Sequence, residues 1–339
     1  MGTPSSSFSK STWSEDAGSL ERREAPSGDA DGAPTLGWLP GGQMLEGRGP
    51  YSRLTANRVA ALGEVWFKAA VEPMNFRGRW VLVTGASSGL GREIARCLAL
   101  EHGANLVLAA RRAARLEELK GELERTARVS VHTIVADLSK TDDMDRVFHE
   151  ATAGRDIYGV VLNAGVTHFG SFDELSWADF QAMLATNVTS VVRLTTLFLP
   201  YLEARNQRGG ILLVASMAGL MPVPYQTAYS GTKAFLINFG RGLHHELEGK
   251  NVSVTTFAPG GIATEMTAGD RFVPLKAWLM PVEPCAREAV RAFAARRDIH
   301  LPGLTNRLGS VLLRFLPQRF VTARMAATYR SALLKSARH

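Results

Sequence analysis

Short apolar runs alternate with longer amphipathic segments through the middle of the chain. The apolar runs predict strands over residues 80–85, 105–110, 130–137, 158–165, 210–216 and 252–260. The intervening segments predict helices over residues 91–102, 113–127, 177–204 and 227–248. Runs that are apolar throughout are typical of parallel strands covered by helices on both faces. The pattern therefore predicts an α/β fold with a doubly wound parallel sheet, the Rossmann arrangement, in a single domain over residues 78–303.

The part of the chain before this domain has a different composition. Residues 1–50 are rich in Ser, Gly and Pro and contain few large apolar residues, which predicts a disordered tail. Residues 51–77 are predicted to form an amphipathic helix and a linker. The apolar residues at helical spacing there are Leu54, Val59, Leu62 and Trp66. No apolar run reaches the roughly 18 residues of a membrane-spanning helix, and no secretory signal is recognisable.

Residues 304–339 form a basic amphipathic extension. Apolar residues recur at helical spacing on both sides of Pro317, at Leu308, Val311, Leu312, Phe315, Val321, Met325, Tyr329 and Leu333. The net charge of +7 arises here, because residues 299–339 contain seven Arg or Lys and no acidic residue. Such a helix pair can lie on an anionic membrane surface, or it can dock on the protein's own body or on a partner subunit. No nucleic-acid-reading element accompanies the charge, so nucleic-acid binding is not expected.

A glycine-rich turn, TGASSGLG, follows the first predicted strand and opens the first predicted helix. Glycines let a backbone approach a pyrophosphate, and a helix N-terminus offers free N–H groups and the positive end of the helix dipole. The turn therefore predicts a dinucleotide-binding site. The residues expected to bind the phosphates are Gly85, Ser87, Ser88, Gly89, Leu90 and Gly91.

Two motifs of other enzyme classes also match this sequence, one in the glycine-rich turn and one at Ser230 and Lys233. Residues 85–89 also match the G-x-S-x-G nucleophile elbow of α/β-hydrolases, for which Asp298 and His300 could be imagined as partners. An elbow normally lies deeper in its sheet, whereas little ordered chain is expected before this turn. Ser230 and Lys233 match the S-x-x-K of penicillin-binding enzymes, but the companion motifs are absent.

The end of the second predicted strand indicates which dinucleotide is bound. An acidic residue there would bind the ribose hydroxyls of NAD, but this chain has Arg111 and Arg112 instead. A guanidinium group suits a 2′-phosphate, so NADP(H) is the expected cofactor.

Over residues 78–303 the sequence resembles the short-chain dehydrogenase/reductase family. The resemblance rests on ordered motifs: TGASSGLG, Asp137-Leu138, the Leu-Asn-Ala-Gly of 162–165, Asn187, Ser216, Tyr229-x-x-x-Lys233, and Pro259-Gly260 with Thr264. It implies an oxidoreductase that transfers a hydride between NADP(H) and a carbonyl group or secondary alcohol.

The resemblance also implies a role for each motif. Tyr229 would protonate the carbonyl oxygen, and Lys233, one helical turn later, would lower the pKa of Tyr229 and hold the nicotinamide ribose. Ser216 would hydrogen-bond the substrate oxygen, and Asn187 would position a water for proton supply. Ser230, Gly231 and Thr232 would mainly set the spacing. The residues implied to line the cofactor are Asp137, Leu138, Asn163, Ala164, Gly165, Tyr229, Lys233, Pro259, Gly260, Ile262 and Thr264, and no metal is expected.

Residues 265–282, called the lid below, are expected to select the substrate. The large apolar residues there are Met266, Phe272, Leu275, Trp278, Leu279 and Met280. They indicate a hydrophobic ketone or alcohol, such as a steroid, retinoid, lipid-like acyl chain or aromatic compound, unless they only pack the lid on the body. Tyr225 is a further expected pocket wall.

One other class of function remains open at this stage. The chain could be a membrane-recruited or partner-binding nucleotide-binding module whose catalysis is incidental, although the intact set of Ser216, Tyr229 and Lys233 favours an enzyme. Cys97 and Cys285 are widely spaced and suit a reducing compartment. We therefore expect a cytoplasmic protein that forms a homo-oligomer, a dimer or tetramer. A peripheral membrane contact is expected through residues 304–339.

Overall fold

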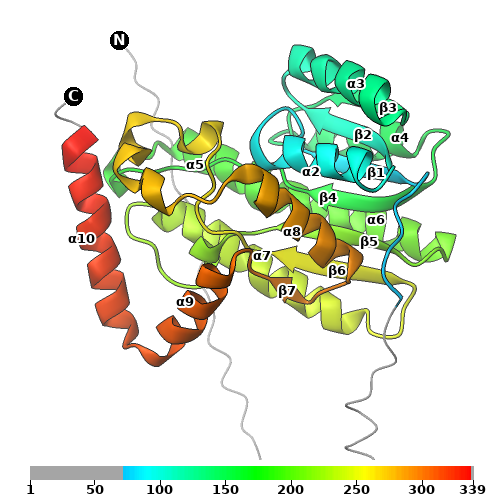
Figure 1. Ribbon diagram of the computed structural model, residues 1–339. Helices are drawn as coiled ribbons and strands as arrows, with labels where there is room; N and C mark the ends of the chain where they lie inside the picture. Colours follow the sequence, from blue (N-terminus) through cyan, green and yellow to red (C-terminus); the bar gives the residue numbers. More distant parts are fainter. Residues whose placement is uncertain (1–71, 337–339) are drawn as a thin grey trace, which may run out of the picture. The chain divides into compact units, whose positions relative to one another are not determined.

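The computed structural model describes residues 72–336, apart from the side chains of Pro274, Val311, Leu313, Arg314, Lys335 and Ser336 (Figure 1). The strands are β1 (Trp80–Thr84), β2 (Asn105–Ala110), β3 (Val131–Val135), β4 (Ile157–Leu162), β5 (Gly209–Val214), β6 (Val252–Phe257) and β7 (Ile299–His300). The α-helices are α2 (Gly89–Leu100), α3 (Ala113–Ala127), α4 (Thr141–Thr152), α5 (Trp177–Leu184), α6 (Ser190–Arg205), α7 (Thr227–Glu246), α8 (Val282–Ala294), α9 (Leu304–Phe315) and α10 (Gln318–Ser336). The short helical elements are η1 (Phe172–Glu174), η2 (Ala185–Thr189), η3 (Met217–Gly219), η4 (Glu265–Thr267) and η5 (Asp270–Trp278).

The strands form one parallel sheet in the order β3-β2-β1-β4-β5-β6-β7. The chain starts at β1, proceeds outward through β2 and β3, and then returns to β4 on the other side of β1. The carboxyl ends of β1 and β4 therefore flank the switch point at which doubly wound sheets bind ligands. The predicted doubly wound sheet is confirmed. The sequence did not indicate β7, because two residues are too short to show a period.

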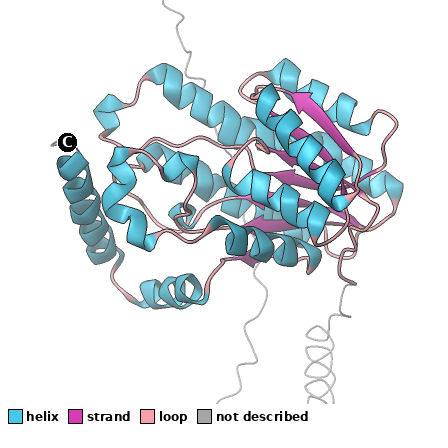
Figure 2. Cartoon of the chain, turned by 45° about the horizontal axis from the view of Figure 1, so that its top comes forward, coloured by secondary structure: helices cyan, strands magenta, loops and turns pink. Residues whose placement is uncertain are grey.

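Helices cover both faces of the sheet (Figure 2). α2, α3 and α8 pack on one face, where Phe293 and Val83 are fully buried. α4, α6 and α7 pack on the other face, where Phe198 and Leu82 are fully buried. Neighbouring strand residues thus point into different apolar clusters, which explains why the strand segments are apolar throughout.

The long helix predicted over residues 177–204 is divided by a π-turn. α5 begins at a side-chain cap, in which the Ser176 hydroxyl accepts the backbone N–H of Asp179 at 3.1 Å. α5 continues through η2, which is a π-helix, into α6. Among residues 72–336, this stretch, Trp177–Arg205, is long and apolar enough to cross a membrane by length and composition alone. Leu194 and Phe198 of this stretch are fully buried on the sheet.

The structure tests the prediction for the C-terminal end of the chain but not most of that for the N-terminal end. The tail predicted over 1–50 and most of the helix and linker predicted over 51–77 lie outside the described residues, so these boundaries stay predictions. Residues 72–77 contain no helix. The C-terminal extension forms α9 and α10, which meet at Pro317, as the amphipathic pattern predicts. α10 packs against η5 of the lid.

Candidate functional site

The glycine-rich turn lies at the carboxyl end of β1, beside the switch point. Gly85 has a φ of +67° and Gly89 a φ of +53°, in the left-handed region that favours glycine. A Cβ atom at Gly91 would lie 2.4 Å from Asn163 Nδ2 and 2.5 Å from the carbonyl oxygen of Gly85. Side chains at these positions would therefore widen the turn and move it away from β4.

The start of α2 offers hydrogen-bond donors at the positive end of the helix dipole. Ser88 is the N-cap residue and makes no side-chain cap bond, so no capping side chain covers the first N–H groups of α2. Ser87 and Leu90 are buried beneath the turn. These free N–H groups suit an anionic phosphate.

Thr84 joins this turn to the end of β4. Its hydroxyl donates to the carbonyl of Val161 at 3.2 Å and accepts the backbone N–H groups of Asn163 and Ala164 at 3.0 and 3.1 Å. Asn163 Nδ2 in turn donates to the Thr84 carbonyl at 3.1 Å. The structure therefore brings Asn163 and Ala164 against the glycine-rich turn.

Arg112, rather than Arg111, reaches the turn. Arg112 donates to the hydroxyls of Ser87, at 3.2 Å, and Ser88. It also lies 2.8 Å from one carboxylate oxygen of Glu265 in the lid. Arg111 is exposed and makes no hydrogen bond or ion pair with any other residue between 72 and 336. The structure thus separates the two arginines that the sequence treats alike.

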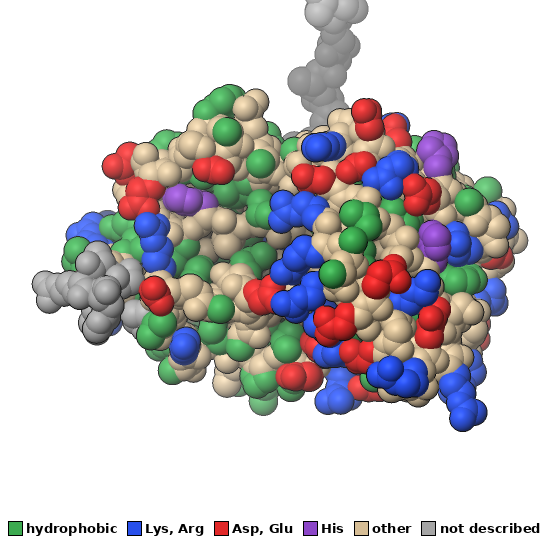
Figure 3. Space-filling view, turned by 90° about the horizontal axis from the view of Figure 1, so that it is seen from above, with side chains coloured by type: hydrophobic (Ala, Val, Ile, Leu, Met, Phe, Trp, Pro, Cys, Tyr) green, Lys and Arg blue, Asp and Glu red, His purple; other side chains and the backbone are tan. Residues whose placement is uncertain are grey.

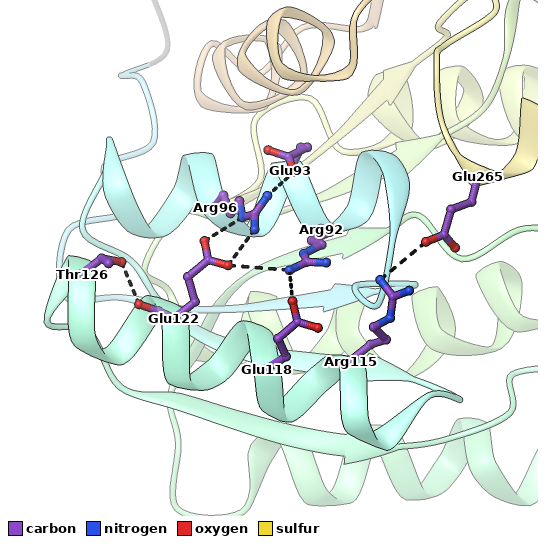
Figure 4. A network of polar contacts seen from close by, with 8 residues as sticks. All are labelled: Arg92, Glu93, Arg96, Arg115, Glu118, Glu122, Thr126 and Glu265. Atoms are coloured by element: carbon purple, nitrogen blue, oxygen red, sulfur yellow. Dashed lines mark hydrogen bonds and ion pairs between the residues drawn. The ribbon is translucent and has the colours of Figure 1, made fainter. Parts of the chain in front are cut away.

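Glu265 links the lid to the start of α3. Its second carboxylate oxygen lies 3.7 Å from Arg115 (Figure 4). The hydrogen bond from Arg112, the charge of Arg115 and a weaker bond from Ser88 hold the pKa of the Glu265 carboxyl below its ordinary value. No sequence pattern indicates this pairing, because Glu265 is far from both arginines along the chain.

Ion pairs also connect α2 to α3 (Figure 4). Arg96 of α2 forms two hydrogen bonds to Glu122 of α3, at 2.6 and 2.8 Å, and Arg92 lies 2.8 Å from Glu118. The hydrogen bond from Arg96 holds the pKa of Glu122 below its ordinary value. A paired guanidinium–carboxylate contact restricts geometry more than a single bond does, so the network orients the start of α3 beside the turn.

Asp137 and Leu138 follow β3 at the same edge of the sheet. Asp137 uses its carboxylate to accept the backbone N–H of Ser139 at 3.1 Å and the Ser139 hydroxyl at 2.9 Å. Its own N–H donates to Asp143 at 2.7 Å. Leu138 is buried. These bonds hold the turn after β3, and adenine contact by the pair stays a prediction.

Asn187 lies in the π-turn η2 and is fully buried. Its Oδ1 accepts the N–H of Val166 at 2.8 Å, and its Nδ2 donates to the Val166 carbonyl at 2.9 Å and to the Thr232 hydroxyl at 3.1 Å. Single π-turns within helices often occur at functional sites. Asn187 therefore joins the segment after β4 to α7, and Thr232 is its partner rather than a mere spacer.

Ser216, Tyr229 and Lys233 meet beyond the carboxyl end of β5. Ser216 is buried, and its hydroxyl donates to the Pro259 carbonyl at 3.4 Å and is hydrogen-bonded to Tyr229. Lys233 Nζ donates to the Val214 carbonyl at 3.0 Å and lies 5.7 Å from the centre of the Tyr229 ring. The motif residues that are separated in the sequence are therefore neighbours in the fold.

Burial shifts both ionisable groups of this cluster. It raises the pKa of Tyr229 above its ordinary value, against the opposing hydrogen bond with Ser216, and a nearby Tyr329 adds to the rise. Burial also lowers the pKa of Lys233 from 10.5 to about 8. Burial outweighs any lowering of the Tyr229 pKa by Lys233, whose ammonium group is bound to a carbonyl oxygen, and the expected lowering stays a prediction. Tyr229 is therefore protonated at neutral pH, as a proton donor must be.

The loop after β6 closes the far side of this cluster. The Pro259 carbonyl accepts the N–H of Met217 at 2.8 Å as well as the Ser216 hydroxyl. A Cβ atom at Gly260 would lie 3.2 Å from Asn306 Nδ2 of α9. The first turn of the C-terminal extension therefore reaches the site.

Three residues lie between the glycine-rich turn and the catalytic cluster: Gly165, Ile262 and Thr264. A Cβ atom at Gly165 would lie 3.5 Å from Lys233 Nζ, and one at Gly89 would lie 3.3 Å from Thr264 Cβ. Ile262 is bridged to the lid at Met280. These positions lie where the sequence places the cofactor, and their contact with it stays a prediction.

The lid contributes less apolar lining than its sequence predicts. Trp278 is 83% exposed, and Met266 is also exposed, so these two side chains face outward. Phe272 is partly buried, with its ring centre 4.8 Å from that of Phe169. The lid and the residues before it line an open hollow of about 420 Å³, formed by Ala263, Thr264, Thr267, Ala268, Lys276 and Leu279. It adjoins the nucleotide turn through Thr264.

A second cavity lies away from these motifs. It measures about 330 Å³, and Arg77, Arg79, Tyr158, Gln207 and Arg296 are among the residues that line it. It lies near the amino ends of the strands. The Arg296 guanidinium there is bound to the Gly209 carbonyl at 3.1 Å and the Ser253 hydroxyl at 2.7 Å. These bonds give the cluster a structural role.

The geometry does not support the two rival motifs. The Ser87 hydroxyl is bound by Arg112, whereas His300 lies 2.9 Å from Glu288 and Asp298 pairs with Arg241. A nucleophilic serine needs a hydrogen-bonded base, which Ser87 lacks within residues 72–336. The Ser230 hydroxyl similarly donates to a backbone carbonyl of its own helix rather than to Lys233.

One group of side chains has metal-ligand chemistry. Cys97, Glu101 and His102 offer ligand atoms within 4.8 Å of one another. Burial raises the pKa of the Cys97 thiol to about 12, and Glu101 is held by Arg287 at 2.6 Å. A protonated thiol and an engaged carboxylate bind a cation poorly, so this group is better explained by packing.

Sequence reasoning missed several residues that build the site. A Cβ atom at Gly219 would lie 2.5 Å from the carbonyl carbon of Lys233, so only glycine lets η3 pack beside the catalytic helix. Thr84, Thr232 and Glu265 act through hydrogen bonds that cross between motifs. Thr84 could have been noticed as the polar end of an apolar strand, but the other contacts depend on the tertiary fold.

Comparison with known proteins adds independent information. A family model described as short chain dehydrogenase matches residues 79–271. Over 196 residues the chain is 37% identical to very-long-chain 3-oxoacyl-CoA reductase-A from Danio rerio and 36% identical to 17-beta-hydroxysteroid dehydrogenase type 3 from Homo sapiens. Each match covers 56% of this chain, and they cover 60% and 61% of those two relatives, respectively.

A solved structure shares the fold. A short-chain dehydrogenase from Sphingobium yanoikuyae in complex with NADPH superposes with a TM-score of 0.61 at 27% sequence identity. The superposition covers 71% of this chain and 97% of that chain. The superposed structure thus matches almost completely, whereas the rest of this chain lies outside the superposition.

Proposed function

Because this chain belongs to the short chain dehydrogenase family, we propose that it transfers a hydride between NADP(H) and the carbonyl or alcohol carbon of a hydrophobic substrate. The observation that carries the proposal is the meeting of Ser216, Tyr229 and Lys233 beside the glycine-rich turn. Asn187, fully buried, supports the same cluster. An intact proton-transfer set favours catalysis over a module that only binds a nucleotide.

The side chains divide the work of the reaction. When bound, the nicotinamide supplies or accepts the hydride. In the reducing direction Tyr229, protonated at neutral pH, gives its proton to the substrate oxygen, which the Ser216 hydroxyl holds by a hydrogen bond. The Lys233 ammonium stabilises the negative charge that this transfer leaves on Tyr229. Asn187 keeps the segment after β4 in place through Val166.

Arg112 supports NADP(H) as the cofactor. The Ser87 and Ser88 hydroxyls, the first N–H groups of α2 and the Arg112 guanidinium are the donors that a phosphate group requires. Figure 3 shows Lys and Arg side chains gathered along one side of a hollow on this face of the molecule. Glu265 balances the charge of Arg112, and a 2′-phosphate would take its place as the partner of that guanidinium.

The substrate class rests on the relatives and on the aromatic residues near Tyr229. The two relatives are named for a very-long-chain 3-oxoacyl-CoA and for a hydroxysteroid. Both names describe compounds with a large apolar part, a very long acyl chain in one and a steroid ring system in the other. We therefore propose a steroid or a lipid-like acyl ketone as the substrate. A cytoplasmic location and a homo-oligomeric state stay predictions.

A panel of ketones, assayed by cofactor oxidation, tests this function. Wild type should oxidise NADPH with steroid and long-chain 3-oxoacyl ketones and should use NADH poorly. Arg112→Ala should raise the KM for NADPH by about tenfold to a hundredfold, because a charge-assisted bond to phosphate is lost, and should leave the KM for NADH nearly unchanged.

Arg111→Ala is the matched control. It removes a guanidinium group that lies next to the site but does not reach the glycine-rich turn, so it should retain at least about half of the wild-type preference for NADPH over NADH. If Arg111→Ala abolished the preference and Arg112→Ala did not, the assignment of Arg112 would be wrong. Wild type with a lower KM for NADH than for NADPH would contradict NADP(H) as the cofactor.

A membrane contact of the C-terminal extension is the second part of the proposal. On α9 the side chains of Leu304, Leu308, Leu312 and Phe315 recur along one face, and all four are exposed, Phe315 at 80%. The extension carries basic residues and no acidic ones. An exposed apolar face flanked by positive charge suits an anionic lipid surface, where it could admit apolar substrates.

Vesicle sedimentation tests this contact. The protein should bind vesicles that contain phosphatidylserine more tightly than neutral vesicles. The double variant Leu312→Ser, Phe315→Ser should bind about tenfold more weakly or worse, because it loses two apolar side chains that would enter the lipid. Leu100→Ser, on the exposed side of α2, is the control. Equal binding by both variants would remove the membrane contact from the proposal.

A further inference from the structure

The last helix, α10, lies at the lid side of the molecule (Figure 1). Ala332 of α10 is only 2% exposed, and α10 packs against η5 of the lid. The apolar residues of α9, in contrast, are exposed. The two halves of the C-terminal stripe therefore have separate roles, and the role of α10 must be sought at the lid.

Three aromatic rings from distant parts of the chain form a continuous surface where α10 docks. The ring centre of Tyr329 on α10 lies 5.2 Å from that of Phe169, in an edge-to-face arrangement. Phe169 lies 4.8 Å from Phe272 of the lid. Phe169 is buried, while the other two rings are partly buried. We call Phe169, Phe272 and Tyr329 the aromatic wall. Such ring pairs are stabilising beyond the area that they bury.

The aromatic wall adjoins the catalytic cluster at two points. Tyr329 is near enough to Tyr229 for a charge on one phenol to raise the pKa of the other. The segment that carries Phe169 starts from Val166, which Asn187 holds by two hydrogen bonds of 2.8 and 2.9 Å. The aromatic wall therefore runs from the segment that Asn187 holds to a helix outside the matched family domain.

A hydrogen bond fastens α10 in this position. Arg330 Nε donates to the hydroxyl of Tyr225 at 2.9 Å. The Tyr225 backbone has a φ of +64°, which is uncommon for a residue other than glycine, and its carbonyl accepts the N–H of Gly170 at 3.0 Å. Tyr225 thus joins α10 to the residue after Phe169. Strained backbone of this kind persists only where the surroundings hold it, and it is often found beside functional sites.

On the basis of the proposed function, we propose that α10 completes the substrate pocket and that Tyr329 contacts the substrate and selects for bulky apolar ketones. The aromatic wall offers the flat apolar surface that a steroid or acyl chain buries, and the Tyr329 hydroxyl offers one polar contact within it. Arg330 and Tyr225 position the helix. Tyr225, expected from the sequence to be a pocket wall, acts in this way as a positioning residue.

Binding and turnover of bulky and small ketones by Tyr329 variants test this assignment. In the presence of NADP⁺, Tyr329→Ala should weaken binding of a steroid ketone, followed by fluorescence, by about tenfold or more, because a large aromatic contact is lost. It should raise KM for that ketone while changing kcat/KM for a small ketone less than about threefold. Tyr329→Phe should keep most of the steroid affinity, because the aromatic ring stays in place.

Two companion variants complete the experiment. Arg330→Met should weaken steroid binding in the same direction, because α10 loses its bond to Tyr225. Thr328→Ala, exposed on α10 one residue from Tyr329, should leave all of these values unchanged. The assignment would be overturned if Tyr329→Ala lowered kcat/KM for bulky and small ketones alike, or if its steroid binding were unchanged. The binding measurement needs no turnover, so it can support the pocket even if the reaction proposed above proves wrong.

Discussion

Tyr229→Phe should lower kcat for ketone reduction by about a thousandfold, within the range lost with a positioned general acid. The substitution removes only the hydroxyl that donates the proton, so the ring should still fill its place beside Lys233. KM for NADPH should change little, because the nucleotide turn and Arg112 are untouched. Steady-state NADPH oxidation with a steroid ketone measures both constants.

Tyr201→Phe provides the matched control. The Tyr201 hydroxyl accepts the N–H of Ile157 at 3.1 Å and donates to the Arg155 carbonyl at 3.2 Å, at the amino end of β4. Its loss should affect stability by about 1 kcal/mol and leave kcat unchanged. Equal rates in wild type and Tyr229→Phe would exclude Tyr229 as the proton donor.

Lys233→Met should separate activity from stability. kcat should fall by about a hundredfold or more, because the positive charge beside Tyr229 is lost. The cofactor-free protein should nevertheless be as stable as wild type at pH 7, or more stable. Charging a Lys whose pKa is lowered from 10.5 to about 8 costs up to about 3 kcal/mol, and the unpaired Val214 carbonyl offsets part of this gain.

The pH dependence of that difference follows from the direction of the shift. Between pH 8 and 10.5 the unfolded chain binds more protons at Lys233 than the folded protein does, so wild-type stability contributed by this group rises with pH. The stability gap between Lys233→Met and wild type should therefore narrow over this window in urea unfolding. Lys250→Met, an exposed lysine 3.0 Å from Glu203, should show no such gap. A large loss of stability in Lys233→Met at pH 7 would contradict the account.

The periodicity of the chain was enough to predict most of the sheet. Strands that are buried on both faces are apolar throughout, and the six runs predicted as strands correspond to β1 through β6. The division of the long helix by η2 could not be predicted in this way, because a π-turn leaves the apolar pattern almost unchanged. β7 was missed because Ile299 and His300 pair only with the end of β6.

Contacts within the candidate site could be predicted from the sequence only where the residues are close together along the chain. Tyr229 and Lys233 share one helix face, so their spacing indicates that they lie together. The contacts of Arg112 with Glu265 and of Tyr329 with Phe169 join residues that are far apart along the chain, and no local pattern encodes them. The direction of the Tyr229 pKa shift likewise depends on burial, which a motif does not report.

Transfer of deuterium from NADPH labelled at the hydride position of its nicotinamide ring tests the central claim most directly. Wild-type protein, incubated with the labelled cofactor and a steroid or long-chain 3-oxoacyl ketone, should form an alcohol that carries the deuterium on the carbinol carbon, as mass spectrometry would show. Tyr229→Phe should form about a thousandfold less of it. Alcohol without deuterium, or no alcohol from any ketone of the panel, would contradict the proposed hydride transfer.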